Sequence, residues 1–424
     1  MGDAPDRHPL MAGNAAASMF AGELDDDWYA HHYNHLDPRL GKTLHASMAL
    51  MRERHPVARS EELGGFYVVS RYADVLNVAQ DWATFSSAQG VTIPGFADST
   101  PAIPEMIDPP LHTTYKRIIN PWFRPATVRE HEDAVRVVVN ELIDDMIDDV
   151  ETNGRTDFIE RFARPLPGIV FFRMYLHAPE SELAEVNKLA TIASIPSLEM
   201  LPAREKMLEW ITGFVADRKA SGPVGDVVDA ILEADIDGRP ITDDEAIGMI
   251  QLLLFGGLDT TAGALGMSMV RFTQHPEIPA FIRAHPEQLD NAVEELLRLD
   301  GPFIAIARTV TRDTEVSGCP MKAGDKVLLS WASANYDEAE FRCPADFDAQ
   351  RESNRHLAFG AGPHRCAGSN LARMNLRIAF SELVRRLPDV RLAVPVEEVE
   401  HHSVFSRVPK SVPLTFTPGP RETR

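Results

Sequence analysis

One cysteine of this chain lies where its sulfur could do chemistry. Cys366 stands between glycine-rich turns and the start of a helical stretch, in the segment HLAFGAGPHRCAGSNLAR at residues 356–373. The chain has 3 cysteines. The other two, Cys319 and Cys343, do not give Cys366 the close spacing of a zinc knuckle or a redox pair. Any chemistry at this sulfur therefore proceeds without a second thiol.

Three roles are open to Cys366. A free cysteine often packs as an inert small hydrophobe. A phosphatase-type nucleophile is disfavoured, because Arg365 separates His364 from Cys366 and the spacing to Arg373 is one residue too long. As a metal ligand, a thiolate would be stabilised by the free amides and the dipole of the helix that follows it. A bare metal ion needs four or more donors, but a haem iron asks the protein for only one or two.

A second segment with chemical potential is GGLDTT at residues 256–261. The adjacent glycines Gly256 and Gly257 allow another body to approach the backbone, and Thr260 can donate its hydroxyl to the carbonyl of Gly256. With the carboxyl of Asp259 alongside, such a groove could hold a small polar molecule and pass it protons. A simple helix-packing notch with a solvated Asp259 is the alternative.

Helical periodicity dominates the elements that must position these groups. Thr242 and Glu245 have the spacing of a capping box, and the apolar run after them predicts a long helix through the interior. Residues 127–150 and 204–219 are also expected to be helical. Strand signals are short, at 64–70 and 326–331. A further helix after Cys366 is predicted by the apolar stripe Ala372, Leu376, Ala379, Leu383 and Leu387, before Pro388.

The composition bounds the fold and the compartment. The 424 residues are 44% hydrophobic and 25% charged, and no linker divides them. We therefore expect one mainly α domain with small β-sheets (α+β) over residues 1–424, with a flexible segment at 1–27. The net charge of −21 disfavours nucleic-acid binding. The sequence lacks a signal-peptide pattern, and its most apolar run, near residue 250, is about half of the roughly 20 residues that span a bilayer. A cytoplasmic protein is expected.

The charge is unevenly distributed. Six basic residues and three acidic ones fall between Phe341 and Arg377, a local net charge of +3. This excess is either a chance fluctuation of a solvated surface or a docking patch for an acidic partner.

These motifs together resemble the cytochrome P-450 superfamily of haem-thiolate monooxygenases, and in particular its soluble bacterial type. FGAGPHRCAG at 359–368 is similar to the haem-thiolate loop, GGLDTT to the oxygen-activation motif, EELLR at 294–298 to the Glu-x-x-Arg signature, and DPPLHTTYKR at 108–117 to the segment that enters a haem-contacting helix. The four occur in the order typical of the family. The resemblance implies a P-450 fold with haem b between the long central helix and the Cys366 loop.

The resemblance also implies roles for individual residues. Cys366 would be the axial thiolate, and Asp259 and Thr260 would relay protons during dioxygen activation. Glu295 and Arg298 would form a structural ion pair. The remaining haem contacts would be made at the propionates by His112, Lys116, Arg308 and His364, beside the sulfur by Phe359 and Gly368, and on the central helix by Gly256.

One position departs from the pattern. Many relatives have an arginine just before the phenylalanine of the segment FRCPADFDAQR, where it completes the ion-pair cluster, but this chain has Asp346. Arg342, Arg351 or an arginine elsewhere is expected to take its place.

The implied reaction is hydroxylation of a hydrophobic small molecule with dioxygen. Electrons would come from NAD(P)H through a reductase and a ferredoxin, which would dock near Arg365 and Arg373 on a monomer that binds neither nucleic acid nor membrane. The substrate is open among terpenoids, steroids, fatty acids and aromatics. Family position places the pocket wall in four stretches, 87–99, 191–201, 302–305 and 404–405, with Val91, Ile93, Pro302, Phe303, Ile304, Val404 and Phe405 as candidates.

Two alternative functions would also require a bound haem. A peroxide-driven peroxygenase would need no ferredoxin, and a non-catalytic haem sensor would need no proton relay. The presence of both Asp259 and Thr260 favours dioxygen activation.

Overall fold

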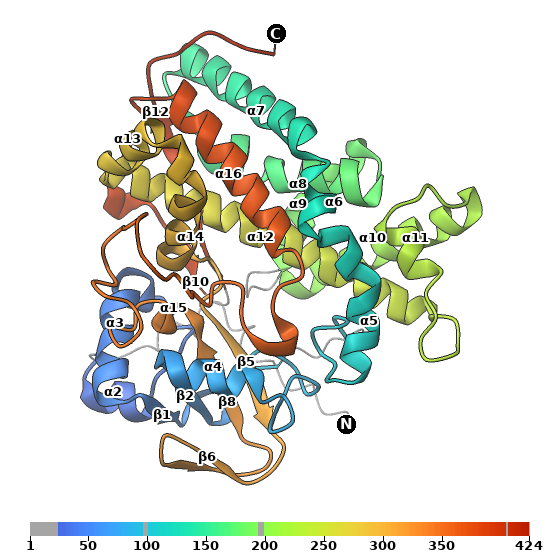
Figure 1. The fold of residues 1–424 in the computed structure, drawn as a ribbon, viewed down its shortest axis with the longest axis vertical. Coiled ribbons are helices and arrows are strands. Elements are labelled where there is room, and N and C mark those ends of the chain that lie inside the picture. Colours follow the sequence, from blue (N-terminus) through green and yellow to red (C-terminus); the bar gives the residue numbers. More distant parts are fainter. Residues whose placement is uncertain (1–23, 96–100, 194–198, 404–405, 424) are drawn as a thin grey trace, which may run out of the picture.

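A computed structural model describes residues 24–95, 101–193, 199–403 and 406–423 of the chain (Figure 1). Val404 and Phe405 lie outside the described residues, as do parts of the stretches 87–99 and 191–201. Most of the segment 1–27 also lies outside them. Its last residues are described, and helix α2 (Asp26–His31) begins there, capped by the side chain of Asp25.

The long helix predicted after Thr242 is α12 (Asp243–Gln274). Its capping box is present as predicted, because the Thr242 side chain accepts from the Glu245 amide and the Glu245 side chain accepts from the Thr242 amide. By length and composition α12 could cross a membrane, but 56% of its most apolar window is buried inside the protein. It is the only such helix in the described part of the chain.

The other long helices pack on α12 or on one another. Helix α16 (Ser369–Arg386) follows Cys366, as the apolar stripe predicts, and packs against both α12 and α7 (Glu132–Asn153). Figure 1 shows α16 and α7 side by side, with α12 running past the start of α16. The apolar side chains between these helices form the largest core of the protein.

A mixed five-stranded sheet joins three strands from the N-terminal part of the chain to two from residues 305–330, in the order β1-β2-β8-β5-β3. The two predicted strands are β2 (Phe66–Val69) and β8 (Lys326–Ser330), which pair in parallel although they lie far apart in sequence. Their side chains alternate between two cores: Val69 and Leu329 face one, and Val68 and Leu328 face the other. Because both faces are covered, these strands read as continuous apolar runs.

The remaining elements complete a mostly helical protein with small sheets, as predicted. The helices are α3 (Leu40–Arg54), α4 (Tyr72–Gln80), α5 (Leu111–Ile119), α6 (Pro125–Arg129), α8 (Pro165–Phe171), α9 (Leu183–Ala193), α10 (Met200–Ser221), α11 (Val227–Leu232), α13 (Glu277–Ala284), α14 (Leu289–Asp300) and α15 (Trp331–Ala334). The strands are β1 (Val57–Ser60), β3 (Phe85–Ser86), β4 (Thr156–Asp157), β5 (Ala305–Val310), β6 (Thr314–Val316), β7 (Cys319–Met321), β9 (Arg391–Leu392), β10 (His401–Ser403), β11 (Arg407–Pro409) and β12 (Pro413–Thr415).

Candidate active site

The loop before α16 holds Cys366 in a fixed turn. The Cys366 amide donates to the Phe359 carbonyl at 2.9 Å, which closes the loop on itself. Gly360 and Gly362 have φ values of 67° and 69°, the left-handed region that glycine adopts most readily. A Cβ at Gly362 would also lie 2.3 Å from the carbonyl oxygen of Ala79 in α4. The loop glycines are therefore required both by the turn and by the close contact with α4.

The surroundings of the Cys366 sulfur suit a thiolate that is bound to a metal. Burial raises the pKa of the Cys366 thiol, while the Gly368 amide and the positive charges of Lys116, Arg365 and Arg373 act in the opposite direction. The residue nevertheless has an exposed surface. The exposed surface of this residue leaves it open to contact with a ligand.

Helix α12 has the local geometry expected at GGLDTT. Thr260 Oγ1 donates to the Gly256 carbonyl at 2.8 Å, as predicted. A Cβ added at Gly256 would meet no atom within 4 Å, whereas one at Gly257 would lie 3.7 Å from the Phe171 ring. Gly256 thus borders open space, and Gly257 provides a packing contact with α8.

The carboxyl of Asp259 is partly buried and is hydrogen-bonded within the protein. It accepts a hydrogen bond from Ser406 Oγ at 3.3 Å. Burial raises the pKa of Asp259, while the positive charge of Arg164 and the Ser406 hydroxyl lower it. The Asp259 carboxyl thus has a protein partner while part of the residue's surface stays exposed.

Four nitrogen-bearing side chains gather around the loop that leads to Cys366. The rings of His112 on α5 and His364 lie 4.3 Å apart. Lys116 Nζ donates to the carbonyl of Pro363 at 2.5 Å. Arg308 on β5 is buried and donates to its neighbouring carbonyl at Ala307. The structure therefore brings together the four side chains predicted to hold propionates.

The electrostatics of this cluster favour an anionic ligand. Burial and the neighbouring cations lower the pKa of His112 to about 4 and that of His364 to about 3. Burial lowers the pKa of Arg308 to about 10, against the opposing charges of Glu105 and Asp108. The Nδ1 atom of His112 is buried with no hydrogen-bond partner. Since buried polar atoms are normally paired, an acidic group placed among these side chains would supply what they lack.

The predicted ion pair of Glu295 and Arg298 is completely buried and has a third member. Arg298 donates to Glu295 at 2.7 and 2.9 Å. Arg351 also donates to Glu295, with its Nη2 at 3.0 Å, while Asp346 contributes its backbone carbonyl to Arg298. Of the candidates to replace the usual arginine, Arg351 is the one in the cluster. Arg342 contributes only its carbonyl, which accepts from Arg351.

A second ion pair lies between α16 and α14. Arg373 makes a bidentate contact with Glu294, at 2.6 and 2.7 Å. Its guanidinium also lies 4.4 Å from the centre of the Phe359 ring, and His356 is 3.1 Å from Glu294. Arg373 therefore ties the Cys366 loop to α14, and its charge is neutralised.

The candidate pocket residues differ in their surroundings. Ile93 and Ile304 are almost fully enclosed in the core beneath the sheet. Pro302 is buried, while Val91 and Phe303 are partly exposed and pack at the edge of the second core. Val91 and Phe303 therefore have the more accessible surfaces for contact with a ligand.

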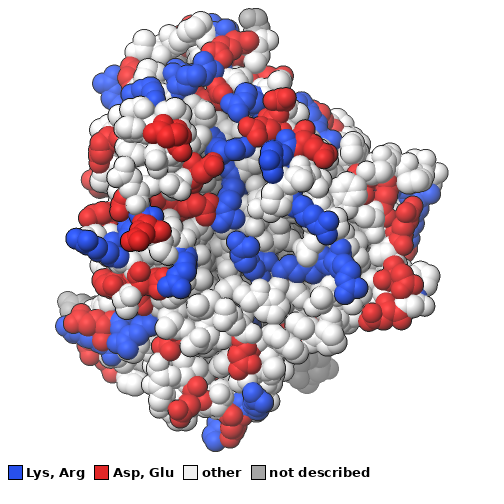
Figure 2. Space-filling model, viewed as in Figure 1, with Lys and Arg blue, Asp and Glu red and all other residues white. Residues whose placement is uncertain are grey.

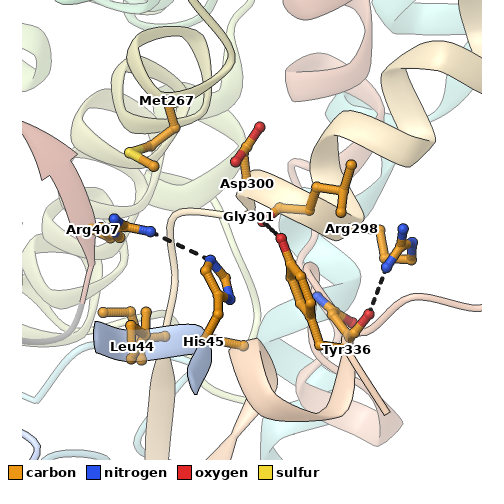
Figure 3. Close-up of a pocket in the computed structure, with 12 residues that line it drawn as sticks. Leu44, His45, Met267, Arg298, Asp300, Gly301, Tyr336 and Arg407 are labelled. Atoms are coloured by element: carbon orange, nitrogen blue, oxygen red, sulfur yellow. Dashed lines mark hydrogen bonds between the residues drawn. The ribbon is translucent and has the colours of Figure 1, made fainter. Parts of the chain in front are cut away.

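A small cavity lies beside the buried ion pair rather than at Cys366 (Figure 3). Its volume of about 10 Å³ holds about one water molecule. His45 and Arg407 enter it from one side, with Arg407 Nη1 3.4 Å from His45 Nε2, and Asp300 and Tyr336 lie on the other. Its size excludes it as a substrate site.

Some residues of the site have no sequence motif that could reveal them. Ser87 contacts His364 at 3.2 Å, and Ser406 contacts Asp259. Arg351 could be named only as one of several candidates. Glu105 is partly buried near Arg308, and burial raises the pKa of its carboxyl.

Cys366 lies in a glycine-rich loop beside a cluster of nitrogen-bearing side chains, two of them histidines and two of them cations, close to a helix that borders open space. A mostly helical protein with such a site is of the class that encloses one large anionic cofactor with a single thiolate ligand. Among the described residues, no three His, Cys, Asp or Glu side chains cluster as a site for a bare metal ion.

Comparison with known proteins identifies the family. The cytochrome P450 family model matches residues 283–412. Cytochrome P450 130 of Mycobacterium tuberculosis is 33% identical over 372 residues, covering 83% of this chain and 89% of the relative. Steroid C26-monooxygenase of the same organism is 33% identical over 390 residues, covering 88% and 94%. The chain belongs to the cytochrome P450 family, and its enzyme class is that of the P450 monooxygenases.

Solved structures give the same result for the fold. A mutant of P450 EryK in complex with erythromycin B has a TM-score of 0.81 and 28% identity, covering 90% of this chain and 98% of that one. CYP268A2 of Mycobacterium marinum in complex with pseudoionone has a TM-score of 0.81 and 27% identity, covering 88% and 95%. The family uses haem b and dioxygen with electrons derived from NAD(P)H. The cations Lys116 and Arg308, the unpartnered Nδ1 atom of His112 and the exposed residue Cys366 fit that cofactor.

Proposed function

We propose that this protein hydroxylates a hydrophobic small molecule, with Cys366 as the only protein ligand of the haem iron. One observation carries the proposal: Cys366 is exposed, and its sulfur receives the Gly368 N–H and lies near Lys116 and Arg365, in a loop that leads into a helix packed on α12. When bound, haem b supplies the iron at which dioxygen is reduced, with one oxygen atom going to the substrate and one to water.

The protein's own groups would each act on one part of this reaction. The Gly368 amide would moderate the charge of the Cys366 sulfur. His112, Lys116, Arg308 and His364 would hold the propionates by charge-assisted hydrogen bonds. Lys116 acts there as a point charge where many relatives use an arginine.

The proton path would begin at α12. The Thr260 hydroxyl donates to the Gly256 carbonyl, so its oxygen lone pairs can accept a hydrogen bond, for example from a water molecule in the open space beside Gly256. The pKa of the Asp259 carboxyl is raised by burial, so this group takes up a proton more readily than an exposed aspartate does. Both groups would deliver protons to dioxygen.

Replacing Thr260 by alanine tests this path. We expect Thr260→Ala to keep consuming NAD(P)H while product per NAD(P)H falls by about 10-fold or more, with hydrogen peroxide released instead. Peroxide and product are measured in the same turnover assay. Thr273→Ala is the control, because Thr273 makes a similar bond to the Val270 carbonyl near the end of α12. Full coupling in Thr260→Ala would show that protons arrive by another route.

The substrate is expected to be apolar. The relatives include a steroid monooxygenase and proteins that bind erythromycin B and pseudoionone. These molecules belong to several chemical classes, so the relatives favour no single class of substrate. Val91, Pro302 and Phe303 are the described pocket candidates that remain after Ile93 and Ile304 are assigned to the core. A screen of steroids, terpenoids, fatty acids and aromatics for a spin-state change in the haem spectrum identifies the substrate, and no response in any class contradicts the proposal.

Electrons would arrive on the face that Figure 2 shows. Lys and Arg side chains gather across the middle of this face, over the region where α5 and the start of α16 lie, and acidic side chains lie mostly toward its edges. A surface pocket of about 400 Å³ lies there, lined by His112, Thr113, Lys116, Arg117, Asn120, Arg124 and Pro363. A ferredoxin with an acidic face would be steered to this region.

The ion pairs sharpen this docking proposal. Of the six basic residues between Phe341 and Arg377, four are bound to carboxylates: Arg351, Arg355, Arg373 and Arg377. Arg365 has no carboxylate partner among the described residues, and it is exposed, as are Arg117 and Arg124. The ferredoxin would therefore meet the charges of Arg117, Arg124 and Arg365 rather than that of Arg373.

Charge reversal at these positions tests the docking face. We expect Arg117→Glu with Arg365→Glu to lower kcat/KM for an acidic ferredoxin by about 10-fold at low salt, and less at high salt, because steering is screened. Substrate binding should not change. Arg155→Glu, an exposed arginine between α7 and β4, is the control for net charge. Equal kinetics in both variants would exclude this face.

We further propose that the protein works as a monomer in the cytoplasm, where reduced ferredoxin is available and the three cysteines stay unpaired. Sedimentation of the purified holoprotein checks its oligomeric state, and fractionation of the producing cells checks its location.

A further inference from the structure

The strand β11 lies unusually close to α12. A Cβ added at Gly263 would lie 2.9 Å from the Val408 side chain, and one at Gly266 would lie 3.2 Å from that of Pro409. Gly263 and Gly266 therefore make room for the strand. Asp259 precedes Gly263 by four residues, so the three share one face of the helix. The strand and the Asp259 carboxyl thus meet along the same face.

Ser406 is the residue of this segment that faces Asp259. Its Oγ donates to Asp259 Oδ2 at 3.3 Å. Its backbone is fixed as well, because Ser406 forms a β-bridge with Phe303 and the following amide, that of Arg407, donates to the Pro302 carbonyl at 2.7 Å. The hydroxyl is therefore presented by a paired backbone and not by a free loop.

Arg407 anchors the strand from the opposite side. Successive side chains of an extended segment point in opposite directions, and while Ser406 faces α12, Arg407 enters the small cavity of Figure 3. There its Nη1 lies 3.4 Å from His45 Nε2, and its Nη2 donates to the Gly41 carbonyl at 3.3 Å. The position of Ser406 is thus fixed by contacts with α3 as well as with residues 302–303.

We propose that Ser406 is a positioning residue that holds the Asp259 carboxyl for proton delivery. The proposal rests on the proton role of Asp259 given above. It adds that the carboxyl is oriented from outside α12, by a strand paired with Pro302 and Phe303 in the candidate pocket wall. The proton-carrying group and that wall are thereby parts of one hydrogen-bonded unit.

Loss of the hydroxyl has a definite physical consequence. The groups that face the Asp259 carboxyl are Ser406 and Arg164, which precedes α8. The Nε atom of Arg164 is buried without a hydrogen-bond partner, while its Nη1 is bound to Glu160. Without the Ser406 hydroxyl, the attraction of Arg164 would favour rotation of the carboxyl toward that side chain, and the orientation of the carboxyl for proton transfer would be lost.

The first test measures coupling. In Ser406→Ala we expect the peroxide released per NAD(P)H to rise about 3- to 10-fold, the range that one lost hydrogen bond allows, together with a larger solvent isotope effect and a shifted pH profile of coupling. Ser406→Thr should restore all three, because it keeps a hydroxyl. Ser411→Ala is the matched control, since Ser411 also donates to a carboxylate, that of Asp157, but on strand β4.

The second test does not depend on turnover. Thermal unfolding of the holoprotein is compared for Ser406→Ala, Asp259→Ala and the double variant. We expect Ser406→Ala to lower Tm by about 1–3 °C alone and by much less when Asp259 is already alanine. Additive Tm shifts together with wild-type coupling in Ser406→Ala would overturn the proposal.

The two tests also separate this inference from the function on which it rests. Non-additive Tm shifts with wild-type coupling in Asp259→Asn would show that Ser406 holds Asp259 but that Asp259 carries no protons. That result overturns the proton role of Asp259, and the proposal with it, whereas additive shifts with an uncoupled Asp259→Asn overturn only the role of Ser406.

Discussion

Cys366→Ser should abolish the thiolate-type spectrum of the reduced carbon monoxide complex and reduce hydroxylation by more than about 100-fold. A serine oxygen is a poor ligand for haem iron because its hydroxyl stays protonated near neutral pH, so the electron donation that helps to cleave the O–O bond is lost. The loop itself should remain intact, since the bond that closes it is made by the backbone of residues 359 and 366.

The two other cysteines provide matched controls. Cys343 is exposed and Cys319 is partly exposed in β7. Both lie outside the Cys366 loop, and neither is among the groups that act on the Cys366 sulfur. Cys343→Ser and Cys319→Ser should therefore leave the spectrum unchanged. If Cys366→Ser kept the thiolate-type band, the iron would have another sulfur ligand and the proposed site would be wrong.

The second large effect is expected at the buried ion cluster. Glu295→Gln should destabilise the protein by about 3–5 kcal/mol, because it leaves Arg298 and Arg351 buried without their shared carboxylate. Against a total of about 5–15 kcal/mol, such a loss should leave little folded holoprotein at 37 °C. Denaturant unfolding and the fraction of purified protein that carries haem measure it.

An exposed ion pair in the same region is the control. Arg355 and Glu340 are bound to each other, but the Arg355 side chain is 70% exposed, and such pairs contribute about 0–1 kcal/mol. Arg355→Gln should therefore change neither stability nor haem content. Similar losses in both variants would mean that the cluster at Glu295 has no special structural role.

Part of this protein is determined by short stretches of its sequence. The Cys366 loop, the capping box at Thr242, the bond from Thr260 to Gly256 and the pair of Glu295 and Arg298 were all predicted, and each was found. They share one property: their partners lie within a few residues, up to one or two helical turns. Propensity and hydrogen bonding at that range depend on local sequence.

Other features were decided only by the tertiary structure. Arg351 was one of several candidates until the chain folded it against Glu295, 56 residues away. The local net charge of +3 around Cys366 was evident in the sequence. Which of these charges are neutralised was not, because Arg373 and Arg377 pair with the distant carboxylates of Glu294 and Glu132. The exposed charges of Arg117, Arg124 and Arg365 are the ones proposed for docking.

The same division applies to Asp259. Its place in GGLDTT was evident in the sequence, but the partners of its carboxyl were not, because Ser406 and Arg164 lie far from it in the sequence, one on each side. Local sequence determines which chemical groups a segment offers and how its backbone turns. The environment that gives those groups their charge and orientation comes from contacts between distant segments, which no single segment encodes.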